Sequence, residues 1–283
     1  MSSTYKDIRP SPIAGTWYSA DPHRLRASIE RYLHEAQPPE LTGEVVALIV
    51  PHAGHIYSGP TTAHAFKTVI GSGFERVVVI SPSHHYYPQP ILTSAHQAYK
   101  TPLGILPIDS EAVEAIDTGL RSELGLHLTP IRHDDEHALE IELPFVQCVL
   151  PQVSKLIPIM LRDQSARLAQ GLGKILADTL RDTKTLLVAS TDLSHFYTED
   201  QANRLDQAIL AEIGAFNPDG LYRLQASGEG QACGLGAAAA VLWAAQALGA
   251  DKVTVVDYRT SANVTQDSSS VVGYGAAVVT KST

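Results

Sequence analysis

Three apolar runs in the sequence are each followed within a few residues by a histidine. The runs and their histidines are residues 45–50 with His52, residues 76–81 with His84, and residues 186–190 with His195. One such histidine alone is most simply interpreted as a hydrogen-bonded loop residue. Three together favour a common metal site, because the end of a strand holds a ligand more rigidly than a free loop does.

His52 and His84 are the two strongest candidates for metal ligands. Two further histidines, His55 and His85, lie close to them in the segments PHAGH and SHH. An adjacent or loop-displaced histidine cannot easily point at the same centre. We therefore expect His55 and His85 to line a cleft or to lie behind the ligands.

Cys233 is the third candidate ligand. It occurs in the segment GQACGLG, directly before an apolar helix expected over residues 234–250. Amide groups at a helix N-terminus lower the pKa of a thiol and favour the thiolate, which binds metals. A small buried cysteine, packed where glycine neighbours leave room, is an equally good interpretation. Cys148, in a helix expected over residues 136–150, lacks these features and is expected in the core.

Asp192 and His195 form a different kind of pair. An aspartate three residues before a histidine on one loop can orient the imidazole, or the two can transfer protons beside a metal. The structural alternative is that Thr191 or Asp192 caps the next helical turn.

A rival zinc-binding motif occurs in the segment HDDEH. His133, Glu136 and His137 match H-x-x-E-H, in which two histidines one helical turn apart bind zinc and the glutamate acts as a base. Acidic residues in a first helical turn are also expected from the helix dipole. Because Pro144 limits the helix and no third ligand is evident on a following helix, we rank a zinc peptidase below the strand-end site.

The elements that must position these residues alternate between strands and helices. Short β-branched runs predict buried strands at residues 45–50, 76–81, 155–161, 186–190 and 252–258. Helices are predicted to begin at Asp21–Pro22 and at Gly59–Pro60, and to cover residues 162–182 and 202–213. This alternation indicates an α/β fold, with a mixed, mostly parallel central sheet and helices on both faces.

Two segments depart from simple alternation. Residues 91–109, with TPLG in the middle, predict a hairpin and hence a mixed sheet. Residues 270–280 predict a strand that closes the sheet. Because no long linker, charge block or internal repeat is visible, residues 1–283 are expected to form a single domain.

Composition excludes several classes of function. The 21 Lys and Arg against 30 Asp and Glu give a net charge of −9 without a basic run, so nucleic acid is not an expected partner. A membrane is not an expected partner either, for a reason of length. The start of the chain lacks the pattern of a signal peptide, and residues 234–250 fall short of the ~20 apolar residues that cross a bilayer. The 2 cysteines are too few for a disulfide framework, which indicates a reducing, cytoplasmic compartment.

Nine short segments occur in a recognisable order along nearly the whole chain. They are AGTWY, PHAG, YSGP, PSH, TPLG, EHALE, LPF, STDLSH and CG. In this order they resemble the Memo-like family, whose bacterial members are called AmmeMemoRadiSam system protein B. That family is similar in fold to the class III extradiol ring-cleaving dioxygenases.

The resemblance implies a metal site made by His52, His84 and Cys233, with Asp192 and His195 beside it. The related dioxygenases hold Fe(II) with two histidines and a glutamate. Cys233 would stand where their glutamate stands, and a thiolate moves the metal preference towards softer ions such as Cu(I).

The resemblance also implies residues around the site. Trp17 is expected near the mouth of the substrate cleft, which Tyr57, His55 and His85 would also line; His55 stands where family members commonly carry an aromatic residue. His133 and His137 belong to a family motif that is not a zinc-peptidase site. The family further suggests a radical SAM protein as a partner.

Three functions follow, in order of preference. The first is a cytoplasmic redox metalloprotein that binds iron or copper and acts on a small molecule or peptide, with His195 transferring protons and Asp192 orienting it or the substrate. The second is a non-catalytic module that binds a peptide or partner protein on a dioxygenase scaffold. The third is the zinc peptidase.

Overall fold

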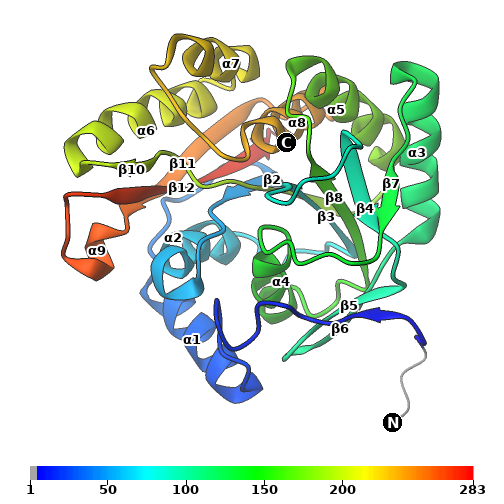
Figure 1. Cartoon of the computed structure of the whole chain (residues 1–283), viewed down its shortest axis with the longest axis horizontal. Coiled ribbons are helices and arrows are strands. Elements are labelled where there is room, and N and C mark those ends of the chain that lie inside the picture. The colour runs from blue at the N-terminus through cyan, green and yellow to red at the C-terminus, as the bar shows by residue number, and fades with distance from the viewer. Residues whose placement is uncertain (1–4, 283) are drawn as a thin grey trace.

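The computed structural model describes residues 5–282. Residues 1–4 and residue 283 lie outside the described residues. The start of the chain, for which the sequence predicts no signal peptide, and the two ends of the predicted domain over residues 1–283 therefore lie outside them too. Within the described part, a nine-stranded sheet runs through the molecule in the order β10-β12-β2-β9-β3-β8-β4-β7, and β11 pairs with β12 (Figure 1). The strands are β2 (Glu44–Val50), β3 (Arg76–Pro82), β4 (Ile91–Ser94), β7 (Thr129–Ile131), β8 (Lys155–Leu161), β9 (Thr185–Ser190), β10 (His195–Tyr197), β11 (Lys252–Thr260) and β12 (Val271–Lys281).

Helices cover both faces of this sheet (Figure 1). One face packs against α1 (Pro22–Glu35), α2 (His55–Lys67) and α4 (Leu143–Val149). The other packs against α3 (Ser110–Leu124), α5 (Ala166–Leu180), α6 (Glu199–Gly214), α7 (Pro218–Ser227) and α8 (Leu235–Ala247). The short helix α9 (Ala262–Thr265) follows β11. The predicted fold class, a mixed α/β sheet with helices on both faces, is confirmed.

Side-chain alternation along the strands divides the core into two layers. In β2, Ile49 packs with the helices of one face, whereas its neighbours Leu48 and Val50 pack with the helices of the other. Both layers are buried, because successive side chains of a strand point to opposite faces and each face carries helices. This explains why the central strands are continuous apolar runs and not alternating ones.

The sheet is mixed, although the predicted hairpin is not the reason. The hairpin over residues 91–109 exists as β5 (Ala98–Thr101) and β6 (Gly104–Pro107), but it forms a separate three-stranded sheet with β1 (Ile8–Arg9). The main sheet is mixed because β4 pairs antiparallel with β8 and β12 pairs antiparallel with β2. The predicted C-terminal strand, β12, lies inside the sheet and does not close its edge.

The helix predicted to begin at Gly59–Pro60 begins earlier, at His55. The amides of Tyr57 and Ser58 donate to the Gly54 carbonyl, and so build a first turn before Pro60. Pro60 therefore lies inside the helix, where it removes one backbone hydrogen bond without ending the helix. As a result His55 belongs to a helix and not to a free loop.

The helix predicted over residues 136–150 is also shorter than expected. Residues up to 139 are irregular, and only the 3-10 turn η1 (Glu140–Glu142) and then α4 are helical. The Glu136 carboxylate accepts hydrogen bonds from the backbone amides of His137 and Ala138, at 2.9 and 3.0 Å. Such local side-chain bonds compete with helix formation, and here they hold the segment in an open turn.

Candidate metal site

The candidate site lies where three neighbouring parallel strands end. β9 lies between β2 and β3, and all three run in the same direction. Their carboxyl ends therefore bring together His52 after β2, Ser190 at the end of β9, and His84 after β3. In open α/β sheets, ligands bind outside the carboxyl ends of the strands, which is where these residues lie.

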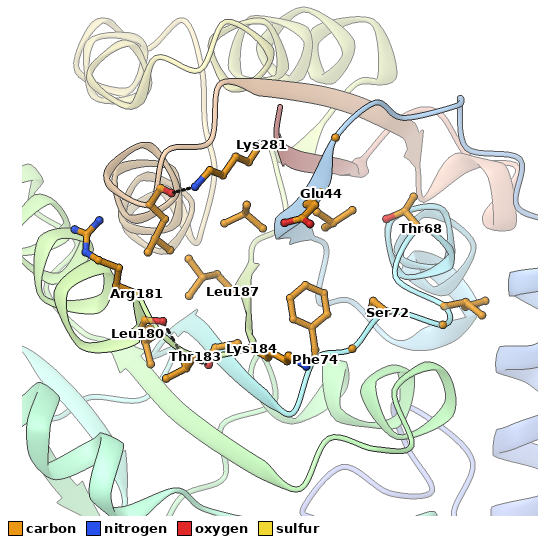
Figure 2. Close-up of a pocket in the computed structure, with 18 residues that line it drawn as sticks. Glu44, Thr68, Ser72, Phe74, Leu180, Arg181, Thr183, Lys184, Leu187 and Lys281 are labelled. Carbon is orange, nitrogen blue, oxygen red and sulfur yellow. Dashed lines mark hydrogen bonds between the residues drawn. The ribbon is translucent and has the colours of Figure 1, made fainter. Parts of the chain in front are cut away.

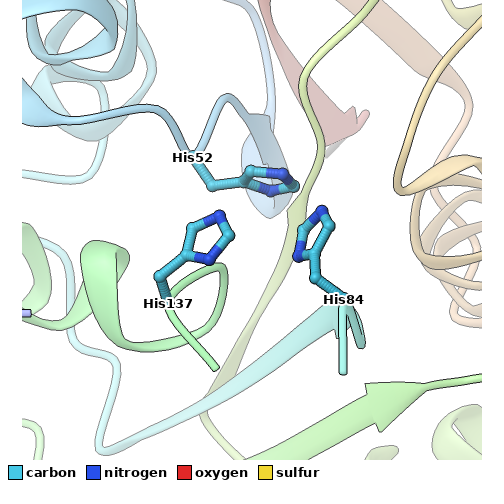
Figure 3. Close-up of side chains that lie close together, drawn as sticks. All are labelled: His52, His84 and His137. Carbon is cyan, nitrogen blue, oxygen red and sulfur yellow. The ribbon is translucent and has the colours of Figure 1, made fainter. Parts of the chain in front are cut away.

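Three imidazoles converge at this edge. His52, His84 and His137 each offer one ring nitrogen, and these atoms all lie within 4.8 Å of one another. Figure 3 shows the three rings pointing toward one another from three separate segments of the chain. The rings of His84 and His137 are stacked, with centroids 4.6 Å apart, and His52 meets both edge-on. We call these three residues the histidine cluster.

One carboxylate holds two of the three rings. Glu136, which is 2% exposed, lies with Oε1 2.9 Å from His84 Nδ1 and 3.3 Å from His137 Nδ1. The backbone amide of His84 also donates to this carboxylate. Such partners fix the tautomer and the orientation of a ligand, and here they leave the Nε2 atom of His84 available. Trp17 stacks on the outer face of His137, with ring centroids 4.0 Å apart.

His52 is held from the other side of the cluster. Its Nδ1 lies 3.0 Å from the Ser190 hydroxyl, and its backbone amide donates to Asp192 Oδ1 at 2.7 Å. With Nδ1 engaged, the Nε2 atom of His52 is the one that can bind a cation.

Burial sets the charge of the cluster. It lowers the pKa of His52 to about 3, with the nearby His84 charge contributing, and it lowers the pKa of His137 to about 3. For His84, burial is the largest single effect and lowers the pKa, but the hydrogen bond to Glu136 and the charges of Glu136 and Asp192 together outweigh it and raise the pKa. The same contacts outweigh burial at Glu136 and lower its pKa to about 2. At neutral pH His52 and His137 are therefore neutral and keep a lone pair for a cation.

Cys233 lies beside the cluster. Its Sγ is 3.1 Å from His52 Nε2, and the Asp192 amide donates to it at 3.3 Å. It directly precedes α8, as predicted, but the expected lowering of its pKa by the helix N-terminus is not observed. Burial, together with the Asp192 carboxyl, raises the pKa of this thiol well above its usual range. The thiol also lies 3.6 Å from the Asp192 carbonyl oxygen, to which it can donate, and the tautomer of His52 decides which atom donates in the Sγ–Nε2 contact.

A glycine allows Cys233 to reach this position. A Cβ atom at Gly234 would lie 2.3 Å from the Ser190 carbonyl oxygen, which is too close for any side chain. The turn before α8 can press against the end of β9 only because residue 234 has no Cβ.

His195 and Asp192 lie next to the cluster without a hydrogen bond recorded between them. The His195 Nδ1 atom lies 2.9 Å from the Leu193 carbonyl, which must accept its proton. That carbonyl, and not Asp192, orients the imidazole and leaves Nε2 free to accept a proton. Asp192 instead anchors the backbone of His52, and burial raises its pKa to about 6.

The remaining cleft candidates are divided by burial. His55 is 4% exposed, and its Nε2 lies 2.9 Å from the Ile141 carbonyl, so it packs behind the site. His85 and Tyr57 are exposed, and Trp17 is half-buried and stacks on His137.

The zinc-peptidase motif does not form its expected geometry. Residues 133–137 are not helical, His133 is exposed, and its carbonyl accepts a hydrogen bond from Tyr87. Glu136 is engaged by histidines and backbone amides, so it is not free to activate a water molecule. Of this motif only His137 joins the cluster.

Sequence reasoning did not assign His137 to the site, nor the roles of Glu136, Ser190 and Glu142. The available signals were the H-x-x-E-H match, which singled out the correct segment for another reason, and the position of Ser190 at a strand end. Nothing in the spacing indicates that Glu142 contacts Ser190, at 2.9 Å.

A separate cavity of about 640 Å³ lies at the opposite edge of the sheet, where β2 and β9 begin (Figure 2). Phe74, Leu187 and Lys281 are among the residues that line it, and no histidine or cysteine is. It is therefore distinct from the cluster.

Within residues 5–282 no helix is long and apolar enough to span a membrane.

Known proteins resemble this chain along nearly all of its length. A family model described as "Memo-like protein" matches residues 9–278. The chain is 34% identical over 281 residues to a MEMO1 family protein of Methanopyrus kandleri, which covers 95% of this chain and 98% of that protein. It is 32% identical over 273 residues to a MEMO1 family protein of Nitrosopumilus maritimus, with the same coverage of 95% and 98%.

One solved structure supports the fold. An uncharacterized protein from Escherichia coli K12 matches with a TM-score of 0.55 and 16% sequence identity, covering 82% of this chain and 99% of that one. At this identity the likeness concerns the fold alone.

Proposed function

The chain belongs to the Memo-like protein family, and on this premise we propose that the histidine cluster binds a redox-active metal ion, iron or copper. The observation that carries the proposal is the convergence of three imidazole nitrogens within 4.8 Å at the carboxyl ends of the central strands. His52 and His84 are the ligands predicted from the sequence. Cys233 is the third ligand predicted from the sequence, and its Sγ lies 3.1 Å from His52 Nε2. His137 is the further donor that joins the cluster.

The donor set fits such an ion. Imidazoles suit iron, copper and zinc, and a thiolate adds a preference for softer ions. One ion with bonds of about 2 Å gathers its ligands within about 4 Å, close to the span of the cluster. Both Glu136 and Ser190 hold a ring through Nδ1, as the partners of metal-bound histidines do.

The surrounding residues support an oxidation of a small molecule or peptide. A bound iron or copper ion supplies one-electron and oxygen chemistry. His195, with Nδ1–H held by the Leu193 carbonyl, accepts or returns a proton through Nε2. Trp17 covers His137 and offers an aromatic surface on one side of the site.

Metal analysis of protein purified without air tests this proposal. The His84→Ala variant is expected to lose most of the bound iron or copper, because it removes a ligand. His85→Ala is the matched control, since it makes the same change at the exposed neighbouring residue and is expected to keep the metal. Equal metal content in both variants, or zinc alone in the wild type, contradicts the proposal.

A second candidate function is a module that binds a peptide or partner protein. Exposed aromatic side chains favour it: Phe196 is 75% exposed and its ring contacts that of His195, with centroids 5.6 Å apart, while Tyr57 is 37% exposed. Oxygen consumption with candidate catechols separates the two functions. No turnover, with affinity for an aromatic or phosphorylated peptide retained in metal-free protein, favours the module.

We also propose a cytoplasmic location and a protein partner for this chain. Both cysteines are free, which supports a reducing compartment such as the cytoplasm. A radical SAM protein is the partner that the family suggests, and co-purification from cells that contain both proteins tests it.

A further inference from the structure

Glu142 is a buried carboxyl group that forms no ion pair within residues 5–282. It is 1% exposed and lies at the end of η1, next to the end of β9. Its recorded hydrogen-bond partner is the hydroxyl of Ser190, 2.9 Å from Oε1. An ionised carboxylate without a cation is costly in such a place, so its proton state needs an explanation.

The explanation comes from counting hydrogens around the Ser190 hydroxyl. Its Oγ atom lies 2.6 Å from the Ala138 carbonyl oxygen, 2.9 Å from Glu142 Oε1, and 3.0 Å from His52 Nδ1. A hydroxyl has one proton to donate and two lone pairs that accept. The carbonyl of Ala138 can only accept, and it is the shortest contact, so it takes the Ser190 proton.

The other two contacts must then deliver hydrogens to Ser190. Two oxygens 2.9 Å apart need a hydrogen between them, and that hydrogen can come only from Glu142. The third contact requires a proton on His52 Nδ1. Every lone pair and hydrogen of the Ser190 hydroxyl is then used once.

We propose that Glu142 is a neutral carboxylic acid that donates to Ser190 and, through this fully engaged hydroxyl, fixes His52 with its Nε2 atom available to a cation. Glu142 is thus a positioning residue that acts on the cluster from behind. The part concerning the cation rests on the proposed metal function, whereas the proton on Glu142 does not. Burial raises the pKa of Glu142 well above its usual value, against the Ser190 hydrogen bond, which lowers it, and with a smaller contribution from the nearby Asp192 carboxyl; the net direction agrees with this assignment.

Glu140 provides an internal contrast. It is equally buried on the same turn, at 0% exposed, but it forms an ion pair with Arg9 and accepts from the Tyr18 hydroxyl at 2.6 Å. All its recorded partners can donate a proton. Two glutamates two residues apart therefore have opposite roles: Glu140 accepts as a carboxylate, and Glu142 donates as an acid.

Carbon NMR of metal-free protein labelled at the glutamate carboxyl carbons tests the proton state. One glutamate is expected to keep the chemical shift of the protonated acid at about pH 7, well above the ordinary glutamate pKa. This signal should be absent from Glu142→Gln and present in Glu140→Gln. If all glutamates are ionised, or if the signal is lost in Glu140→Gln alone, the proposal is wrong.

Nitrogen NMR of the same samples tests the effect on His52. The ring is expected to carry its proton on Nδ1, both in the wild type and in Glu142→Gln, whose amide can replace the acid as a donor. A proton on Nε2 of His52 would overturn the positioning role.

Anaerobic Fe(II) titration then tests the consequence for binding. Glu142→Gln should bind Fe(II) with an affinity within about twofold of the wild type. Glu142→Leu, which cannot donate, should bind Fe(II) about tenfold more weakly, which is the smaller of the losses of metal affinity seen when a partner that orients a ligand is removed. Equal affinity in Glu142→Leu overturns the positioning role. If the wild type binds no metal, the proposed function fails with that role, while the carbon spectrum still decides the proton state.

Discussion

The Nε2 atom of His52 lies 3.1 Å from the Sγ atom of Cys233, although 181 positions separate the two residues in the sequence. His52 follows β2, and Cys233 precedes α8, which packs over β2, β3 and β9. The contact places a soft donor beside the histidine cluster. A bound cation would displace the thiol proton and could use both side chains.

Replacement of this thiol tests its part in metal selection. Cys233→Ser is expected to lower Cu(I) affinity by at least about tenfold, because a neutral hydroxyl is a poor ligand for a soft ion. Competition with a chromogenic Cu(I) chelator without air measures the change. Cys148→Ser is the matched control and should bind like the wild type. Unchanged affinity in Cys233→Ser would exclude the thiol as a ligand.

The two histidines of the H-x-x-E-H segment are expected to differ. His137→Ala should reduce metal content strongly because it removes one of the three cluster nitrogens, whereas His133→Ala, at an exposed residue outside the cluster, should not. Elemental analysis of both variants measures the difference. Comparable losses would instead support the zinc-peptidase arrangement.

Ser190 supports both His52 and Glu142, so its removal should affect binding and stability together. Ser190→Ala leaves the buried Nδ1 of His52 without a partner, which predicts a 10–100-fold loss of metal affinity, roughly the effect of losing an orienting partner. Unfolding in urea should show a loss of about 1–3 kcal/mol. Ser81→Ala is the control, because that buried hydroxyl donates to the Pro82 carbonyl and not to a cluster histidine. Wild-type affinity in Ser190→Ala would argue against the proposal that Glu142 positions His52 through the Ser190 hydroxyl.

The raised pKa of Glu142 predicts a pH-dependent difference between the wild type and Glu142→Gln. Above the ordinary value of 4.5, the unfolded wild type releases the Glu142 proton while the folded protein keeps it. The contribution of Glu142 to stability is therefore full below that pH and is lost as the pH rises towards the folded pKa. Relative to Glu142→Gln, the wild type should lose up to about 1.4 kcal/mol per pH unit.

Urea unfolding of both proteins from acidic to alkaline pH measures this difference. The buried histidines His52, His55 and His137, with lowered pKa values, act in the opposite direction, and Asp192 also titrates near Glu142. These groups are common to both proteins and largely cancel in the difference. A difference that does not change with pH would show that Glu142 is ionised in the folded protein.

Arg9 holds the segment that carries His137. Its guanidinium forms ion pairs with the buried Asp134 and Glu140 and donates to the Glu136 carbonyl at 2.9 Å. Arg9→Met should destabilise the fold by about 3–5 kcal/mol, because it leaves two buried carboxylates unpaired. It should also weaken metal binding by moving His137. Arg132→Met, at an exposed arginine, should change little, and equal effects would refute this role of Arg9.

The strands that form the site were predictable because their sequences are buried on both faces. β2, β3, β8 and β9 are continuous apolar runs, and the predicted bounds of each agree with the structure to within one residue. The strands β1, β7 and β10 are only 2 or 3 residues long, so their existence depends on the partner strand and not on their own sequence.

The sequence by itself determined the α/β fold and the placement of His52 and His84 after buried strands, because hydrophobic periodicity and strand-end positions are local properties. The order of its short motifs identified the family. Only the tertiary structure decided that His137 completes the cluster. That residue lies on an irregular segment held by Arg9, from more than a hundred positions away, and by a carboxylate that bonds its own backbone. The hydrogen-bonded group of Glu142, Ser190 and His52 is likewise a long-range product of packing, because only close approach in space decides which atom donates to which.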